Sequence, residues 1–178
     1  LFFAQKFYKW VNSIVPNKFQ DLSNDHPRLV IPFFDEDNKM FAFQGRAFGK
    51  ENPKYITIIL DPTKDKIYGL NRLDKNIPIF AVEGPIDSLF LDNYIAGGGA
   101  DFYKLPLNYT IIFDNERRNK EVLKQIEKTI TNGYKVVLWP DDIKEKDINE
   151  MILSGKTKED VKRLIAKNTY QGNMALIK

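Results

Sequence analysis

Residues 78–87 read Pro-Ile-Phe-Ala-Val-Glu-Gly-Pro-Ile-Asp, and this stretch indicates the fold of the chain. Residues 79–82 are all apolar, which is the pattern of a short strand covered on both faces of a sheet. Glu83 follows the strand directly, and the glycine after it allows a sharp turn. Pro85 suits the first turn of a helix, which would bring Asp87 close to Glu83. We therefore expect two carboxylates at the carboxyl end of a buried strand, where ligands bind in open α/β sheets.

These two carboxylates also have a simpler structural explanation. An acid in the first turn of a helix interacts favourably with the free N–H groups and the helix dipole. Two acids placed together nevertheless repel each other, and a divalent cation would offset that repulsion. The stretch alone leaves helix capping and cation binding open.

The composition indicates a globular chain that forms one good-sized domain or two small ones. The chain has 178 residues, of which 43% are hydrophobic and 29% are charged. It contains no cysteine, so no disulfide and no thiolate zinc site is expected within it. No apolar run is long enough for a transmembrane helix, so we expect no membrane partner and a cytoplasmic location. The start lacks an initiator Met and the shape of a signal peptide, which suggests a piece of a longer protein.

The first part of the chain is predicted to be β-rich. Residues 2–11 carry aromatic side chains at roughly helical spacing, which predicts an amphipathic helix. The apolar runs 28–34 and 40–47 flank a polar turn that begins at Asp35, as in a β-hairpin, and residues 56–60 form a third strand. We expect the acids of that turn to be solvated.

Residues 1–78 are predicted to form one small basic subdomain. The net charge is +3, and acids and bases balance in residues 79–178, so the excess lies in the first part. Arg46, Lys54 and Lys66 stand near aromatic residues, an interleaving that suits a track for single-stranded nucleic acid. Ordinary solvated lysines would give the same pattern, and the sequence leaves both interpretations open.

From residue 79 onward, predicted strands and helices alternate, which favours an α/β fold with a parallel sheet flanked by helices. This domain is predicted to cover residues 79–155, and a helical extension residues 156–178. Gly98 lies within three glycines that follow a strand, and they permit either close approach to a phosphate or a tight turn. We expect further strands at residues 94–96, 110–113 and 134–139, and helices at residues 85–93, 117–132 and 158–167.

Acidic loops follow three of the predicted strands or their connections. Residues two apart on an extended chain face the same way, so two acids spaced in this manner can point at one site. Successive loops at the same sheet edge suggest a convergent site. Oxygen ligands without His or Cys predict Mg²⁺ or Mn²⁺. The loops supply Glu83 with Asp87, Asp114 with Glu116, and Asp147 with Asn149.

These motifs resemble the Toprim domain of bacterial and tailed-phage DNA primases. Glu-Gly-x-x-Asp at residues 83–87, Asp-x-Glu at 114–116 and Lys-Asp-x-Asn-Glu at 146–150 follow one another in the family's order. Upstream, Phe-Gln-Gly-Arg and Pro-Lys-Tyr resemble the small basic subdomain that precedes Toprim in primases. The resemblance covers roughly residues 28–155, and it looks closer to tailed-phage primases than to bacterial ones.

The resemblance implies an enzyme that joins ribonucleotides on a single-stranded DNA template, using NTPs and two divalent ions, Mg²⁺ or Mn²⁺. By position, Glu83 matches the acid often proposed as general acid or base. Asp114 and Glu116 match the metal-binding pair, and Asp87 and Asp147 match supporting acids.

Two positions depart from the family pattern, which often has Asp in place of Glu116 and Asn149. Glu116 keeps the charge on a longer arm, whereas Asn149 loses a charge. By resemblance, Arg46 and Lys54 lie on the basic ridge that handles the template or the incoming nucleotide. The family also implies an N-terminal zinc-ribbon domain outside this chain and a replicative helicase as partner.

Two alternative functions remain open from the sequence. A Toprim nuclease or topoisomerase fragment would share the acidic motifs, although no tyrosine here stands in a context that identifies a topoisomerase nucleophile. A single-stranded-DNA-binding module with a degenerate Toprim site would keep the fold without the chemistry. Cleavage of DNA without NTPs would distinguish the nuclease, and DNA binding with weak Mg²⁺ binding would distinguish the module.

Overall fold

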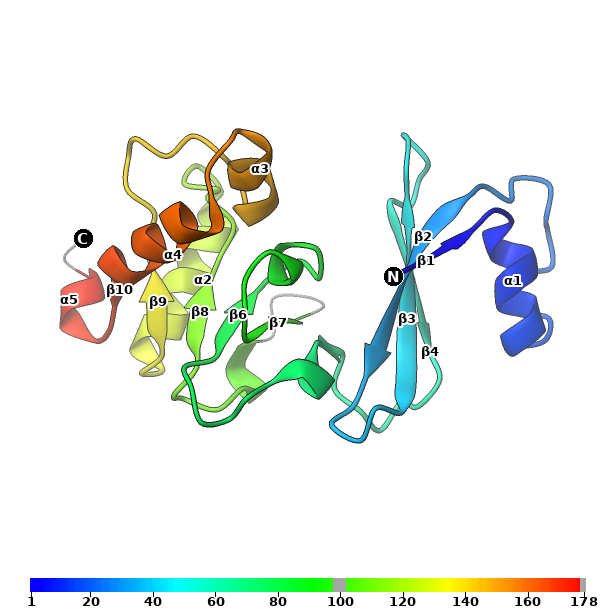
Figure 1. Ribbon diagram of the computed structural model, residues 1–178, viewed down its shortest axis with the longest axis horizontal. Coiled ribbons are helices and arrows are strands. Elements are labelled where there is room, and N and C mark those ends of the chain that lie inside the picture. The colour runs from blue at the N-terminus through cyan, green and yellow to red at the C-terminus, as the bar shows by residue number, and fades with distance from the viewer. Residues whose placement is uncertain (98–101, 177–178) are drawn as a thin grey trace. The chain divides into compact units, whose positions relative to one another are not determined.

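The computed structural model describes residues 1–97 and 102–176, so the candidate Gly98 lies outside the described residues. The chain divides into two compact units, Leu1–Lys66 and Ile67–Lys178 (Figure 1). Strands dominate the first unit, whereas strands and helices alternate in the second, which confirms the predicted fold class. Among the described residues, no helix is long and apolar enough to cross a lipid bilayer.

The first unit is an antiparallel sheet with one helix, α1 (Phe7–Ile14), packed against it. Phe7 and Val11 of α1 are fully buried and pack in a cluster with Phe43 of the sheet. The Phe7 ring stands where a Cβ on Gly45 would lie, so this packing requires glycine. The strands, in sheet order, are β1 (Phe2–Ala4), β2 (Arg28–Phe34), β3 (Met40–Ala47) and β4 (Tyr55–Ile59).

The predicted helix over residues 2–11 is wrong at its start. Phe2 and Phe3 belong to β1, which pairs with β2, and the helix begins only at Phe7. The carboxylate of Asp25 accepts hydrogen bonds from the N–H groups of Tyr8, at 2.7 Å, and Lys9, at 3.1 Å. Because this helix cap comes from a distant part of the chain, no local signal marks where the helix begins.

The acidic hairpin turn also differs from expectation, because Asp35 is buried rather than solvated. Its side chain accepts hydrogen bonds from the N–H groups of Asp37 and Lys39, and it pairs with Lys64 at 3.2 Å. Asp35 is only 7% exposed, so it shapes the turn instead of facing solvent.

The second unit is built on a mixed sheet in the order β10-β9-β8-β6-β7-β5. Its four inner strands are mutually parallel, as predicted, and the two edge strands are antiparallel to their neighbours. The strands are β5 (Ile67–Tyr68), β6 (Phe80–Val82), β7 (Tyr94–Gly97), β8 (Thr110–Ile112), β9 (Lys135–Val137) and β10 (Thr169–Tyr170).

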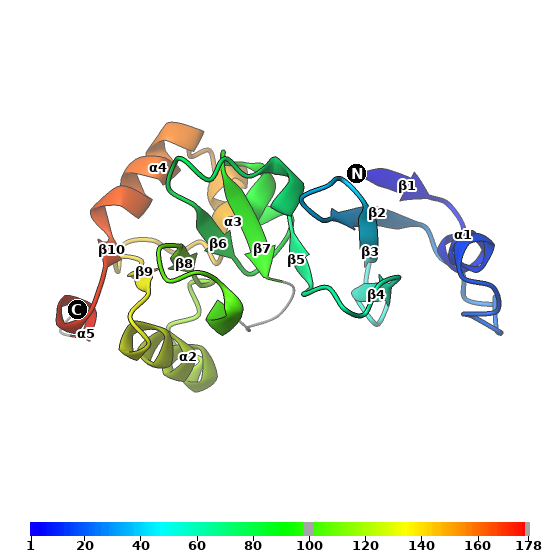
Figure 2. The ribbon, with the colours of Figure 1, turned by 90° about the horizontal axis from the view of Figure 1, so that it is seen from below.

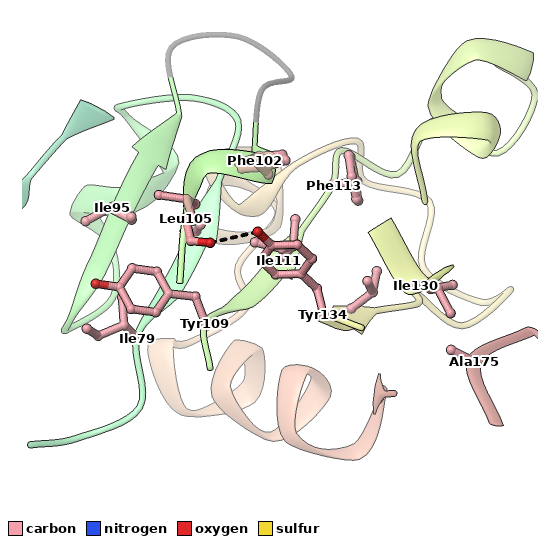
Figure 3. Close-up of a cluster of buried hydrophobic side chains, with 12 residues drawn as sticks. Ile79, Ile95, Phe102, Leu105, Tyr109, Ile111, Phe113, Ile130, Tyr134 and Ala175 are labelled. Atoms are coloured by element: carbon pink, nitrogen blue, oxygen red, sulfur yellow. Dashed lines mark hydrogen bonds between the residues drawn. The ribbon is translucent and has the colours of Figure 1, made fainter. Parts of the chain in front are cut away.

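Helices cover both faces of this sheet. Figure 2 shows α2 (Lys120–Thr131) on one face and α4 (Lys158–Lys167) on the other. Ile130 of α2 packs into a buried cluster with side chains of the inner strands (Figure 3). In this cluster the hydroxyl of Tyr134 donates a hydrogen bond to the Leu105 carbonyl at 2.7 Å. The other helical segments are η1 (Leu70–Arg72), η2 (Asp87–Leu89), η3 (Phe102–Lys104), α3 (Ile148–Leu153) and α5 (Asn173–Leu176).

The helix predicted over residues 85–93 is wrong, since this segment contains only the short 3₁₀ turn η2. Local turn hydrogen bonds extend only as far as Phe90, and bonds to distant residues hold the rest of the segment. Asn93 adopts a φ of 63°. Its amide nitrogen donates to carbonyls before β6, including that of Pro78 at 2.9 Å. Asp87 in turn accepts a hydrogen bond from the Asn149 N–H. Such contacts cannot be deduced from residues 85–93 alone.

The domain boundaries also shift. The sequence placed the first boundary after residue 78, but the structure divides after Lys66 because β5 pairs with β7 of the second sheet. Residues 156–178 are not a separate extension, since their strand β10 pairs with β9. The second unit therefore needs residues on both sides of the predicted 79–155 domain to complete its sheet.

Candidate active site

The topology of the second unit brings the acidic loops to one edge of its sheet. Strands β6, β8 and β9 are adjacent and parallel, with Val82, Ile112 and Val137 in register near their carboxyl ends. Glu83 directly follows β6, and Asp114 follows β8 after one further residue. Figure 1 shows α3, whose N-cap is Asp147, at the end of the sheet toward which β9 points. The convergent edge predicted from the sequence is thus present.

Glu83 and Asp114 are linked directly. The N–H group of Asp114 donates a hydrogen bond to Oε1 of Glu83 at 3.0 Å. Burial raises the pKa of Glu83. Burial, and after it the charge of Glu83, raises the pKa of Asp114 to about 7, with further contributions from Asp87 and Asp147. The edge therefore concentrates more negative charge than it can solvate well.

Asp87 and Asp147 hold the start of α3 in place. Asp87 is only 9% exposed, and its Oδ1 accepts a hydrogen bond from the Asn149 N–H at 2.9 Å. Asp147 caps the same helix, since its Oδ1 accepts from the Glu150 N–H at 2.7 Å. Asn149 thus joins the site through its backbone. A small recess is lined by Val82, Asp87, Ile112, Phe113, Asp114, Trp139, Asp147 and Ile148.

Glu116 lies beside a lysine that the sequence motifs contained but that we did not single out. The Lys146 ammonium group is 2.6 Å from Oε1 of Glu116 and 3.4 Å from Oδ2 of Asp114. Hydrogen bonds from Lys146 and Asn119 lower the pKa of Glu116. The signal that could have identified Lys146 is its place next to Asp147, in the loop that faces the other acids.

Asn115 is a second residue that the sequence reasoning missed. Its side-chain nitrogen donates to the carbonyls of Ile143 and Glu145, both at 3.0 Å, and its N–H donates to the Lys146 carbonyl at 2.6 Å. The backbone bends at Asn115, where the Glu116 N–H donates to the Asp114 carbonyl at 2.8 Å, and the Asn115 side chain contacts the neighbouring loop. Its place between the two acids of the Asp-x-Glu motif was the available signal.

The donors at this edge suit a hard divalent cation. Among residues 1–97 and 102–176, no three or more His, Cys, Asp or Glu residues lie close enough together to hold a metal ion. All the acids offer oxygen, which Mg²⁺ and Mn²⁺ prefer. The carboxylates around Asp114 raise its pKa, and a cation there would offset that repulsion.

An open groove adjoins the acidic edge. It has a volume of about 620 Å³, and Glu116 and Arg117 are among the residues that line it. Arg117 forms an ion pair with Asp141, and its Nε donates to Oδ1 of Asn115 at 2.9 Å. The groove therefore offers both charge signs next to Glu116. Its lining residues are Asn115, Glu116, Arg117, Arg118, Asn119, Asp141, Ile143 and Lys144.

The first unit holds two of the three predicted basic residues around one exposed ring. The Arg46 guanidinium lies 5.8 Å, and the Lys54 ammonium 5.9 Å, from the centre of the Tyr55 ring. Buried Arg28 holds the chain before Tyr55 in place. Its Nη1 donates hydrogen bonds to the carbonyls of Lys54, at 3.3 Å, and of Pro53 and Gly45. Lys66 is the last residue of the unit.

A row of paired residues with an aromatic ring at each end crosses the sheet of the first unit. Phe3 pairs with Leu29, Leu29 with Arg46, and Arg46 with Tyr55, so their side chains share one face. Phe3 is 64% exposed and Tyr55 is 38% exposed. This face thus combines exposed aromatic rings with positive charge.

Comparisons with known proteins agree with this fold. No family model matches the chain. The DNA primase of Enterobacteria phage T4 is 40% identical over 182 aligned residues, covering 98% of this chain and 53% of the phage protein. This chain thus spans about half the length of that relative.

Solved primase structures have the same architecture. The E. coli primase catalytic core aligns with a TM-score of 0.63 and 18% identity, over 87% of this chain and 58% of that one. A DnaG primase catalytic domain bound to ssDNA aligns with a TM-score of 0.60 and 19% identity, over 81% of this chain and 54% of that one. The chain is therefore a homologue of a phage DNA primase and has the fold of DnaG primase catalytic cores.

Proposed function

We propose that this chain is the catalytic core of a DNA primase, with a Toprim-type second unit that joins ribonucleotides into short primers on single-stranded DNA. One observation carries the proposal: the linked pair Glu83 and Asp114 lies at the carboxyl edge of the parallel strands in a homologue of T4 DNA primase. The DnaG domain with the same fold is bound to ssDNA, which supports the choice of template.

In this proposal, the acids of the second unit hold two divalent ions, Mg²⁺ or Mn²⁺. Asp114 and Glu116 would be the main ligands, with Asp87 and Asp147 in supporting positions and Asn149 contributing no charge. When bound, such ions stabilise negative charge on the attacking and leaving oxygens of phosphoryl transfer. The open groove beside Glu116 leaves room for a nucleotide next to these acids.

Glu83 would move the proton. Its Oε1 is engaged by the Asp114 N–H, which leaves Oε2 as the atom that accepts the proton of the attacking ribose hydroxyl. Burial raises the pKa of Glu83, and a base whose pKa is closer to neutral holds the transferred proton better. The proton can then leave to solvent, because Glu83 is only partly buried.

The first unit would bind the template. Arg46 and Lys54 offer charge to the DNA phosphates, and the Tyr55 ring between them offers a surface on which a base can stack. Lys66 would add charge at the end of the unit. A zinc-ribbon domain outside this chain, a replicative helicase and a cytoplasmic location complete the proposal.

The test is primer synthesis from labelled NTPs on ssDNA with Mg²⁺ or Mn²⁺. We expect the wild type to make short RNA and Asp114→Ala to make none, while Asp114→Ala keeps the circular dichroism spectrum of the wild type. Asp142→Ala removes a nearby exposed acid outside the proposed site and is expected to stay active.

Undiminished synthesis by Asp114→Ala would contradict the site. If the wild type made no RNA, even with the N-terminal domain supplied, the proposal would fail. Cleavage of the template in the same reaction would then identify a nuclease, and DNA binding without any product would identify a binding module.

A further inference from the structure

Lys146 lies between the two acids that we propose as main metal ligands. Its ammonium group is 2.6 Å from Glu116 and 3.4 Å from Asp114, so one side chain bridges both carboxylates. An ammonium group donates to the same oxygen lone pairs that a divalent cation would use. Lysine and metal ion are therefore alternative partners for this pair of acids.

Hydrogen bonds fix the backbone of Lys146 so that its ammonium group lies beside Asp114 and Glu116. Its carbonyl accepts from the Asn115 N–H at 2.6 Å, and its own N–H donates to Oε2 of Glu150 at 2.8 Å. The Asn115 side chain also binds the carbonyls of Ile143 and Glu145. The residue between the two acids thus holds the loop that carries the lysine.

Other lysines of the same loops have different partners. The ammonium group of Lys144 donates to the Asp141 carbonyl, and that of Lys156 pairs with Glu145. The bridge to Asp114 and Glu116 therefore belongs to Lys146 within the described part of these loops. The side chain of Lys146 is 48% exposed, so it can swing away while its backbone stays in place.

We propose that Lys146 is a built-in counter-ion that exchanges partners during loading of the site. In the metal-free protein it neutralises Asp114 and Glu116. A divalent cation displaces it, and the freed ammonium group then binds the phosphates of the nucleoside triphosphate. This inference rests on the proposed function, because it takes these two acids as metal ligands.

The proposal explains how a crowded acidic edge stays folded without a metal ion. After burial, the carboxylates of Glu83, Asp87 and Asp147 raise the pKa of Asp114, and Lys146 is the positive group that acts in the opposite direction. Hydrogen bonds and charge from Glu116, and after it from Asp114, raise the pKa of Lys146. A charged lysine on a flexible stem is also a common phosphate ligand.

Two calorimetric titrations test the exchange in opposite directions. The first titrates Mn²⁺ into metal-free wild type, Lys146→Met and Asp114→Asn. Without its competitor, Lys146→Met is expected to bind Mn²⁺ about fivefold to tenfold more tightly, as expected from the loss of two partly exposed ion pairs. Asp114→Asn should no longer bind Mn²⁺, which would show that the heat measured with the wild type comes from metal binding at this site.

The second titration adds ATP at saturating Mn²⁺. Here Lys146→Met is expected to bind about fivefold more weakly, because the phosphates lose a cationic partner. A lysine with a merely structural role would weaken both ligands when replaced. Tighter metal binding together with weaker nucleotide binding therefore supports the partner exchange specifically.

Two further variants serve as controls for these titrations. Lys162→Met removes a lysine that also bridges two carboxylates, Asp92 and Glu159, far along the chain on α4, and should leave both titrations unchanged. Lys146→Arg keeps the charge and should bind Mn²⁺ as weakly as the wild type. It tests the inference even if Lys146→Met folds poorly, since tighter Mn²⁺ binding by Lys146→Arg would contradict it.

The outcomes separate this inference from the proposed function. Equal Mn²⁺ affinity in wild type and Lys146→Met, with binding lost in Asp114→Asn, would overturn the exchange and leave the metal site standing. An absence of Mn²⁺ binding in every protein, Lys146→Met included, would overturn the proposed metal site, and the counter-ion role with it.

Discussion

The two units of the molecule handle charge in different ways. In the first unit, Arg46 on β3 and Lys54 just before β4 lie near the exposed ring of Tyr55. In the second, Glu83 and Asp114 converge at the ends of parallel strands, where burial and mutual repulsion change their protonation. Charges in the first unit are open to solvent and salt, so we expect their effects to be small and roughly additive. Charges in the second unit are coupled, so changing one changes the others.

After the complete loss expected of Asp114→Ala, the largest effect is expected from Glu83→Gln, which keeps the size of the side chain and removes its basicity. Loss of a general base typically lowers a rate about a hundredfold to ten-thousandfold, and we expect primer synthesis to fall within that range. Initial rates of labelled primer formation at saturating NTP measure it. Glu127→Gln, on the exposed side of α2, is the matched control. A Glu83→Gln rate within threefold of wild type would remove Glu83 from the mechanism.

The sequence predicted the convergence of these acids because parallel topology determines where strand ends lie. Short apolar runs followed by acids are local patterns, and β6 and β8 were found from them. The contact between the Asp114 N–H and Glu83 joins two such patterns and follows from the register of adjacent strands. The fold class and the acidic edge were therefore accessible from sequence.

Features that depend on distant partners were not accessible. The start of α1 is set by Asp25, and the segment expected as a helix after Glu83 is held by Asn93 and by contacts with α3. The bridge from Lys146 to both acids needs two loops to meet, which no single stretch encodes. The two residues missed at the site, Lys146 and Asn115, are those whose side chains link one loop to another.

The coupling in the second unit should be visible as a pH dependence of stability. The pKa of Asp114 is raised from 3.8 to about 7, so between these values the folded protein holds a proton that the unfolded chain releases. The metal-free protein therefore loses stability from this group as pH rises from about 4 to about 7. Asparagine cannot ionise, so Asp114→Asn should match the wild type near pH 4 and exceed it above pH 7.

We expect the difference in melting temperature above pH 7 to be on the order of 2–5 °C. Differential scanning calorimetry in EDTA between pH 4 and pH 8 measures it, with Asp142→Asn as the control for loss of an exposed acid. A constant difference between Asp114→Asn and wild type at all pH values would mean that Asp114 does not titrate in this range.

The smallest effect is expected in the first unit, from Arg46→Ala. Arg46 is partly exposed, and one such charge on a DNA phosphate contributes little, so we expect ssDNA affinity to fall about threefold to fivefold. The dependence of log affinity on log salt should become shallower by about 0.7, the slope of one phosphate contact on a single strand. Fluorescence anisotropy with labelled oligonucleotides over a salt series measures both. Lys9→Ala, an exposed lysine of α1, should change neither. If Arg46 and Lys54 act independently, the factors by which the two single variants lower ssDNA affinity should multiply in the double variant. A larger loss of affinity would show that the two charges are coupled in the first unit as well.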